Sequence, residues 1–328
     1  MSRAARSLLA VAVSLIAAAL AGCGTSSDSA LRITLAALGT PPARAVLAGS
    51  PSPGPTCPDM TASLHPQAST PAPGAMPPGS YMAEIRRRGH LIAGVNAGAL
   101  DFGYLNPANG HIEGFEIDLV RELARAIFGD PNAYRLVALS VPQRIPFVQD
   151  GRVDIVVDTV TITCDRRQQV DFSSVYYDAQ QRVLVPANSP AAGIGDLAHK
   201  RVCASAGSTP IEVMNGLTPS VRPVAVGKPQ AIDCLVDLQE GKVGAISTDD
   251  SILLGFKAQD PNTKIVGSSM ADVPYGMAIS KAHPDFVRFV NGVLAKLRAD
   301  GTWTRLYERW IGHISGSSPA LPPARYDG

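Results

Sequence analysis

Residues 151–174, GRVDIVVDTVTITCDRRQQVDFSS, constrain the fold more than any other stretch of this chain. The segment opens with an apolar run over 153–160 that is rich in β-branched residues and contains two aspartates. Such a run is typical of a strand buried on both faces, as in a parallel sheet flanked by helices. We therefore predict a buried strand here, with polar residues at its end.

Three threonines and an arginine follow this run. Thr159, Thr161 and Thr163 alternate along the chain, so their side chains would share one side of an extended segment. Arg166 comes next, and its planar guanidinium matches the two oxygens of a carboxylate, with hydroxyl groups completing the shell. The pattern indicates a carboxylate site. Ordinary strand-forming threonines beside a solvated arginine remain the alternative.

The rest of the chain alternates strand and helix patterns. Strands are predicted at 91–95, 134–139, 182–186, 201–204, 221–226, 243–247, 265–267 and 275–280. Helices are predicted at 83–88, 114–128, 145–149 and 229–239, and two final helices within 284–310. The pattern at 114–128 has helical spacing and stops at Gly129-Asp130-Pro131. Alternating elements predict an α/β fold with mostly parallel sheets, and 328 residues are enough for two domains.

Two blocks carry a resemblance to a known family. GRVDIVVDTVTITCDRRQQVDFS, followed after two intervening residues by a tyrosine, and GFEIDLVRELA at 114–124 resemble the extracellular solute-binding proteins of family 3, the polar amino-acid receptors of ABC transporters. The resemblance extends over about 91–310. It implies a two-lobed periplasmic-binding-protein type II fold, in which each lobe is a mostly parallel sheet flanked by helices and the ligand cleft lies between the lobes.

The resemblance also implies where the lobes begin and end. We expect the first part of lobe 1 at 81–184, lobe 2 at 185–274, and a return segment of lobe 1 at 275–313. Two crossings between the lobes make a hinge. A flexible tail is expected at 314–328.

In the family, threonines and an arginine bind the α-carboxylate of the ligand. Those roles fall here on Thr161 and Arg166, with Thr159 lining the site. The loop at 205–209 resembles the family's SGT-type loop, whose backbone N–H groups and hydroxyls hold a second face of the carboxylate. Its candidate residues are Gly207, Ser208 and Thr209. A small-residue turn without function is the alternative for each of them.

Asp249 is the candidate for the ligand's ammonium group. It follows the strand predicted at 243–247, at the carboxyl end where ligands gather in open α/β sheets. The family places its ammonium-binding carboxylate at this point. Either aspartate of the pair could instead start the next helix, and we assign that role to Asp250.

Phe102 and Tyr104 are candidates for an apolar wall beside the ligand's methylene groups, with burial against the sheet as the alternative. Many family members carry an aspartate early in this loop, whereas the matching place here is near Gly98. The missing side chain shifts ammonium binding toward Asp249 and backbone carbonyls.

Arg144, in VPQRIPF, stands where the family often keeps an NR or QR pair. A cation here would reach the side-chain end of the ligand and favour Glu or Asp over the neutral amides. An exposed helix residue is the alternative.

These features predict a receptor for Glu, Gln, Asp or Asn that serves an ABC permease, or else a membrane sensor that reads the closed lobes. An enzyme is disfavoured because the candidate residues include no Ser/His/Asp or Cys/His set. We expect no cofactor and no metal. A net charge of +1 indicates no nucleic-acid partner, and we expect a monomer.

The N-terminus predicts export. Arg3 and Arg6 precede an apolar run over 8–20 and the sequence Leu-Ala-Gly-Cys, which ends at Cys23. This resembles a lipobox, with a signal peptide at 1–22 and lipidation of Cys23. A plain signal peptide is the alternative, and a run of thirteen residues is too short to span a membrane. The proline-rich stretch 23–80 is expected to be a linker between a lipid anchor on the outer face of the cell membrane and the receptor.

Four further cysteines allow three disulfide connectivities. Cysteines outside the cytoplasm tend to pair. Proximity within one lobe favours Cys203 with Cys234, which leaves Cys57 with Cys164. The latter pairing would pin the end of the linker to the folded body.

Replacing Cys23 tests the lipobox. We expect a Cys23→Ser protein to appear in the soluble fraction or to accumulate unprocessed, because the acylated residue is lost. Fractionation followed by mass spectrometry of the N-terminus measures this. A variant that is cleaved and membrane-bound like the parent would contradict the assignment.

Overall fold

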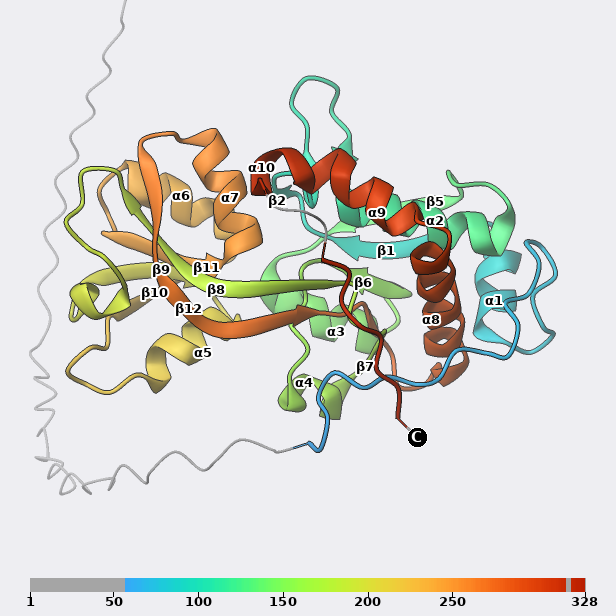
Figure 1. Ribbon diagram of the computed structural model, residues 1–328. Coiled ribbons are helices and arrows are strands. Elements are labelled where there is room, and N and C mark those ends of the chain that lie inside the picture. The colour runs from blue at the N-terminus through green and yellow to red at the C-terminus, as the bar shows by residue number, and fades with distance from the viewer. Residues whose placement is uncertain (1–56, 317–319, 328) are drawn as a thin grey trace, which may run out of the picture. The chain divides into compact units, whose positions relative to one another are not determined.

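The computed structural model describes residues 57–316 and 320–327, and two five-stranded sheets form its framework (Figure 1). The sheet of lobe 1 has the order β5-β1-β6-β13-β7. Its strands are β5 (Tyr134–Ala138), β1 (Leu91–Val95), β6 (Ile155–Val157), β13 (Ala278–Ile279) and β7 (Asp171–Phe172). β1 pairs in parallel with both β5 and β6, so the carboxyl ends of these strands meet at one edge.

Lobe 2 repeats this plan with the order β10-β9-β11-β8-β12. Its strands are β10 (Val224–Lys228), β9 (Arg201–Ser205), β11 (Ala245–Asp249), β8 (Tyr177–Pro186) and β12 (Thr263–Tyr275). β10, β9 and β11 are parallel, whereas β8 and β12 run antiparallel. The prediction of an α/β fold with mostly parallel sheets in two lobes is confirmed. A small antiparallel sheet joins β2 (Gly98–Ala99), β3 (Gly103–Leu105) and β4 (Ile112–Glu113).

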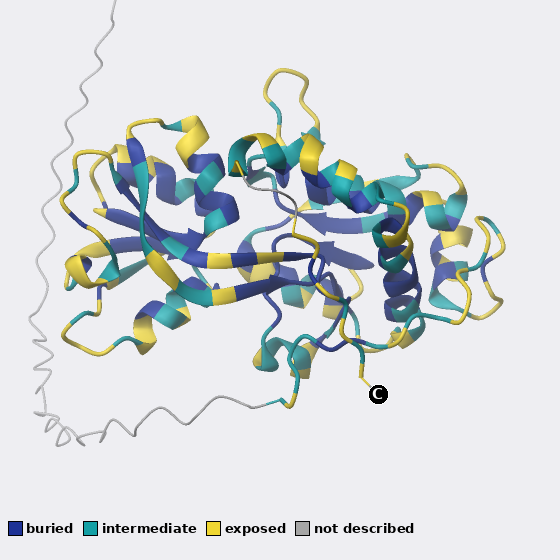
Figure 2. Cartoon of the chain, in the orientation of Figure 1, coloured by how far each residue is buried: buried dark blue, intermediate teal, exposed yellow. Residues whose placement is uncertain are grey.

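Helices cover both sheets and bury the strands (Figure 2). Those of lobe 1 are α1 (Tyr81–Arg88), the 3-10 turn Val141–Gln143, α3 (Arg144–Gln149), α2 (Phe115–Phe128), α4 (Cys164–Gln169), α8 (Pro284–Ala299) and α9 (Thr302–Tyr307), followed by a π-helical turn at Glu308–Gly312 and α10 (His313–Ser315). Those of lobe 2 are the 3-10 turn Ile194–Leu197, α5 (Thr209–Gly216), α6 (Ala231–Gln239) and α7 (Asp250–Gln259). α2 ends where its sequence predicts, at Gly129 with φ of 80°.

Strands β8 and β12 carry the chain between the lobes. They pair along their length, from Tyr177 opposite Tyr275 to Pro186 opposite Thr263, with an irregularity between Val266 and Ala271. β8 begins in the core of lobe 1 and ends in the core of lobe 2, whereas β12 begins in the core of lobe 2 and ends in the core of lobe 1. Both are longer than the predicted 182–186 and 265–267, because cross-strand pairing extends them through polar residues that show no strand pattern.

The predicted strand at 153–160 is shorter in the structure, where β6 spans only Ile155–Val157. The backbone turns at Thr159, whose φ of 44° lies in the left-handed region. The chain then runs beside β12, with Ile162 N donating to Pro274 O at 2.9 Å and Thr161 bridging Tyr275. The three threonines therefore do not share one side of a single strand.

Residues 57–80 lie on lobe 1, to which the expected Cys57–Cys164 disulfide attaches them. Residues 320–327 also contact lobe 1 and do not extend away from it as the expected tail. The side chains of Ala62, Ser63 and Met76 are buried, and Ser63 bridges Tyr326. Buried hydrogen bonds hold residues 57–80 on lobe 1. The proline-rich composition of this segment does not reveal these bonds. The expected linker before residue 57, the signal peptide and Cys23 lie outside the described residues.

Both predicted disulfides are present: Cys57 pairs with Cys164, and Cys203 pairs with Cys234. The second pair ties β9 to α6 inside lobe 2, where both cysteines are fully buried. No helix in the described part of the chain is both long and apolar enough to cross a membrane.

Removing the lobe 2 disulfide should destabilise the protein. The cysteines are 31 residues apart, so we expect Cys203→Ser/Cys234→Ser to lower the free energy of unfolding by about 3 to 4 kcal/mol. Urea denaturation measures the change, and non-reducing peptide mapping of the parent checks the pairing. Free thiols at both positions in the parent would contradict the assignment.

Candidate functional site

A small cavity of about 20 Å³ lies between the two lobes. Five of its lining residues come from lobe 1: Asn96, Arg144, Thr159, Thr161 and Arg166. Eight come from lobe 2: Ser205, Ser208, Thr209, Pro210, Ala231, Thr248, Asp249 and Ile252. Most of them follow a strand or start a helix, because the carboxyl ends of the parallel strands in both sheets face this point.

Arg166 lies on α4, and its guanidinium contacts both lobes. Nη1 donates to the Thr161 carbonyl at 2.8 Å in lobe 1, and Nη2 lies 3.4 Å from the Gly207 carbonyl in lobe 2. Burial, with the nearby Arg144, lowers the pKa of Arg166 to about 10, so the group is still a cation at neutral pH. A poorly hydrated guanidinium that faces neutral carbonyl groups is well placed to bind an anion.

Thr161 lies beside Arg166 and reaches the other lobe. Its Oγ1 is 3.1 Å from Oγ1 of Thr209, the first residue of α5. Thr163 does not join this cluster, because its hydroxyl caps α4 and accepts from the backbone N of Arg166 at 3.2 Å. The alternating threonines thus divide into two cavity residues, Thr159 and Thr161, and one helix cap.

Asp249 ends β11, and its carboxylate is buried in the cleft. Oδ2 accepts a hydrogen bond of 2.6 Å from the Tyr275 hydroxyl, whereas Oδ1 has no hydrogen-bond partner among the described residues. Burial raises the pKa of Asp249 to about 6, although the Tyr275 hydrogen bond acts in the opposite direction. A buried acceptor without a partner suits an ammonium donor. Asp250 starts α7 and accepts from the Ser251 backbone N at 2.8 Å, which fits the role assigned to it.

Arg144 lines the cavity from α3 but is already paired. Its Nη2 lies 2.8 Å from Oδ1 of Asp158, which also accepts from the Asn96 amide at 2.9 Å. Both members of the ion pair are buried. Burial raises the pKa of Asp158, while Arg144 acts to lower it. The positive charge of Arg144 is therefore largely compensated at the cavity.

A further buried acid, Glu116 of α2, lies behind the cavity and contacts the backbone of Thr159. Its Oε1 accepts from the Thr159 backbone N at 2.6 Å and from the Tyr176 hydroxyl. Burial, with the nearby Asp158, raises the pKa of Glu116 to about 7. The Glu116 contact holds the left-handed backbone at Thr159 and so directs the chain toward Thr161.

In the loop at 205–209, Ser208 and Thr209 line the cavity, and the Ser208 hydroxyl donates to the Ser205 carbonyl at 2.6 Å. Gly207 has φ of 69° and contributes its carbonyl to the Arg166 contact. The left-handed conformation accounts for glycine at this position.

The structure corrects the expected aromatic wall. Phe102 is fully buried in the lobe 1 core, with its ring 5.1 Å from that of Tyr177. Tyr104 belongs to β3, and neither side chain lines the cavity. Gly98 does not line it either, and a Cβ there would lie 2.9 Å from Ile232 Cγ2, so an aspartate would need this neighbour to move. The apolar residues that line the cavity are instead Pro210, Ala231 and Ile252.

Several polar residues at the site were not predicted. Asn96 and Asp158 directly follow the buried strands β1 and β6, and Ser205 ends β9. The sequence could have indicated these three residues, because polar residues at the carboxyl ends of parallel strands often line a binding site. Thr248 precedes Asp249 on β11, and Tyr275 was predicted only as part of a strand. Among the described residues, no group of three or more His, Cys, Asp or Glu side chains could hold a metal ion.

Residues 91–313 match the model of the bacterial extracellular solute-binding proteins, family 3. The chain belongs to this family. The ABC transporter glutamine-binding protein GlnH of Bacillus subtilis (strain 168) is 32% identical over 231 residues, covering 70% of this chain and 84% of that protein. A glutamine-binding protein of Geobacillus stearothermophilus is 33% identical and covers 63% of this chain and 79% of that protein.

Solved structures agree with this assignment. An ancestral arginine-binding protein bound to glutamine has a TM-score of 0.63 and 30% identity, covering 69% of this chain and 99% of that one. A solute receptor for L-cysteine of Neisseria gonorrhoeae has a TM-score of 0.67 and 25% identity, covering 72% and 95%. The family is described as extracellular, and the chain is a solute-binding protein rather than an enzyme.

Asp249 should make the stability of the ligand-free protein depend on pH. Its folded pKa of about 6 lies above the ordinary value of 3.8. The neutral carboxyl therefore favours folding at low pH, and this contribution is lost as the pH rises from about 4 to about 6. Asp249→Asn keeps a neutral group, so we expect it to raise the free energy of unfolding above pH 6 by on the order of 2 to 3 kcal/mol.

Urea denaturation between pH 4 and pH 7.5 measures this effect, with Glu308→Gln, at an exposed surface position, as the control. The Asp249→Asn curve should be flatter than the parent's across the lower half of this range. An Asp249→Asn protein that is less stable than the parent at pH 7 would contradict this expectation, because it would mean that the ionised Asp249 carboxylate stabilises the fold.

Proposed function

We propose that this chain is an extracytoplasmic receptor that holds a polar amino acid as a bridge between Arg166 of lobe 1 and Asp249 of lobe 2. The α-carboxylate binds the guanidinium, with the Thr161 and Thr209 hydroxyls and the loop at 205–209 around it. The ammonium binds Asp249. One observation carries the proposal: the half-buried Arg166 guanidinium and the buried Asp249 carboxylate, which has one oxygen without a partner among the described residues, line the same cavity from opposite lobes.

The candidate ligands are Glu, Gln, Asp and Asn, and we favour Gln. Two relatives above 30% identity are named as glutamine-binding proteins. The ion pair between Arg144 and Asp158 supports the same choice, because a compensated cation attracts a second carboxylate less than a free one would. Thermal shift across the twenty amino acids tests this, since a ligand at a hundredfold excess over its Kd adds about 2.7 kcal/mol of stability.

The receptor is proposed to be anchored through lipidated Cys23 and to deliver its ligand to an ABC permease. Relatives of this chain are named as components of ABC transporters. A membrane sensor as the partner would use the same closed lobes. Copurification from detergent-solubilised membranes distinguishes the two, because the permease brings an ATPase subunit with it.

Substitutions at the two ends of the ligand should have different effects. Arg166→Ala leaves the ligand carboxylate without its forked partner in a mostly dry cleft, so we expect a loss of about 3 to 5 kcal/mol, more than a hundredfold in Kd for L-glutamine. Asp249→Ala should keep weak binding but lose ligand-induced compaction, because the ligand no longer draws lobe 2 toward lobe 1.

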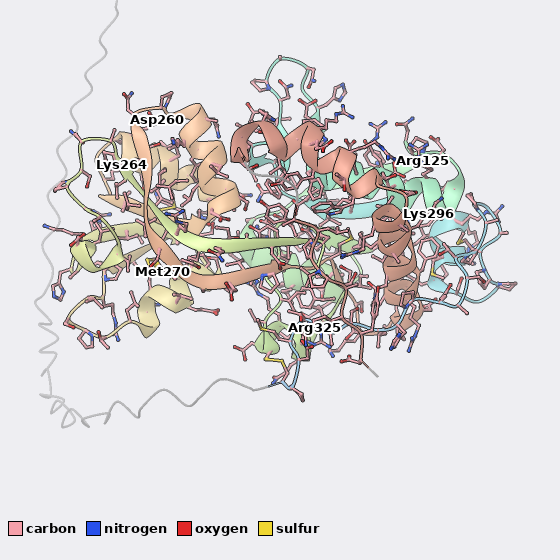
Figure 3. The ribbon with its side chains drawn as sticks, in the orientation of Figure 1. Arg125, Asp260, Lys264, Met270, Lys296 and Arg325 are labelled. Carbon is pink, nitrogen blue, oxygen red and sulfur yellow. A yellow bond between two sulfur atoms is a disulfide. The ribbon has the colours of Figure 1, made fainter. Side chains whose placement is uncertain are left out.

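Calorimetry gives the affinities and small-angle scattering gives the compaction. Arg125→Ala, on the surface of α2 away from the cavity, is the matched arginine control (Figure 3). Binding by Arg166→Ala within about threefold of the parent, only roughly 0.65 kcal/mol, would rule out the carboxylate assignment. Normal closure of Asp249→Ala on the ligand would rule out the bridge.

A further inference from the structure

Residues 57–65, which we call the N-terminal strap, lie outside the part of the chain that matches the family model. The strap holds α4 at two points. Cys57 forms a disulfide with Cys164, the first residue of α4, and the Arg167 guanidinium donates to the carbonyls of Met60 and Ala62. The helix that carries Arg166 is thus attached to a segment distant in sequence.

Apart from the strap, α4 is held by its Thr163 cap, by the Gln149 amide, which donates to the Gln169 carbonyl at 3.3 Å, and by an ion pair of 3.4 Å between Arg167 and Asp327. It spans only six residues, and none of them is buried. A helix this short is marginal without tertiary contacts. Cys164 and Arg167 are three positions apart and share one side of the helix, whereas Arg166 projects from a different side. The strap contacts therefore fix α4 from one side while Arg166 reaches the cavity from another.

The strap is itself firmly attached to lobe 1. The Ser63 hydroxyl donates to the Phe172 carbonyl at 2.6 Å and accepts from the Asn291 amide at 2.8 Å. Arg325, near the C-terminus, pairs with Asp59 of the strap at 2.7 Å (Figure 3). These contacts make the strap a support that can hold a short helix in place.

We propose that the N-terminal strap is part of the ligand-binding apparatus, with Cys57, Cys164 and Arg167 as positioning residues that hold Arg166 for the ligand carboxylate. The inference rests on the proposed function in one respect, namely that Arg166 binds this carboxylate. Without the strap contacts, α4 and Arg166 must be ordered when the ligand binds, and ordering a long side chain lowers affinity. The effect is confined to the carboxylate end of the ligand.

The strap disulfide also differs from the lobe 2 disulfide in its accessibility. Cys57 and Cys164 are partly exposed, whereas Cys203 and Cys234 are fully buried. A mild thiol reductant should therefore open the strap disulfide first, because thiolate attack requires access to a sulfur atom.

The test compares L-glutamine with L-glutaminamide, which keeps the ammonium but lacks the α-carboxylate. The ratio of the two Kd values, amide over acid, reports how well Arg166 recognises the carboxylate, and a general loss of stability would not change it. We expect Cys57→Ser/Cys164→Ser and Arg167→Ala to lower this ratio by about three- to tenfold, with Arg167→Lys between Arg167→Ala and the parent.

Cys203→Ser/Cys234→Ser is the matched control, because it removes a disulfide without touching α4, and its ratio should equal the parent's. If Cys57→Ser/Cys164→Ser does not fold, Arg167→Ala decides the outcome. A drop of the ratio toward one in Arg166→Ala, together with the parent's ratio in Arg167→Ala, overturns the strap inference alone. The parent's ratio in Arg166→Ala overturns the carboxylate assignment of the proposed function instead.

Discussion

The pairing of β8 with β12 is the constraint on which the site depends, because these two strands are shared between the lobes. At their lobe 1 end, Tyr275 forms a β-bridge with Thr161, and its hydroxyl donates a hydrogen bond to Asp249 of lobe 2. One residue of a crossing strand thus touches both the segment that leads to Arg166 and the carboxylate across the cleft.

The electrostatics of the cleft suit a zwitterion better than a simple anion or cation. Arg166 and Asp249 offer one charge of each sign, while the Arg144–Asp158 pair is internally compensated. Burial of Asp249 with one oxygen unpartnered is unfavourable in the free protein, as the raised pKa of this group indicates. A bound ammonium would supply the missing donor. The free protein is thus less stable than it could be, and under the proposed function the binding of an ammonium group would recover that difference.

The sequence predicted Arg166, Thr161 and Asp249 at the cavity because each follows a recognisable strand, and strand ends in parallel sheets meet at one edge. It failed at Phe102, since a glycine-rich loop does not reveal on which side an aromatic ring is buried. The left-handed turn at Thr159 depends on Glu116, far away in sequence. The sequence predicted the Cys57–Cys164 attachment of the strap but not its contacts with Arg167, because the backbone carbonyls that Arg167 contacts have no sequence signature.

The crystal structure of the complex with L-glutamine tests the central claim most directly. We expect the α-carboxylate within about 3 Å of the Arg166 guanidinium and the ammonium within about 3 Å of Asp249 Oδ1, with one ligand touching both lobes. A ligand held by one lobe alone, or bound with its ammonium away from Asp249, would contradict it.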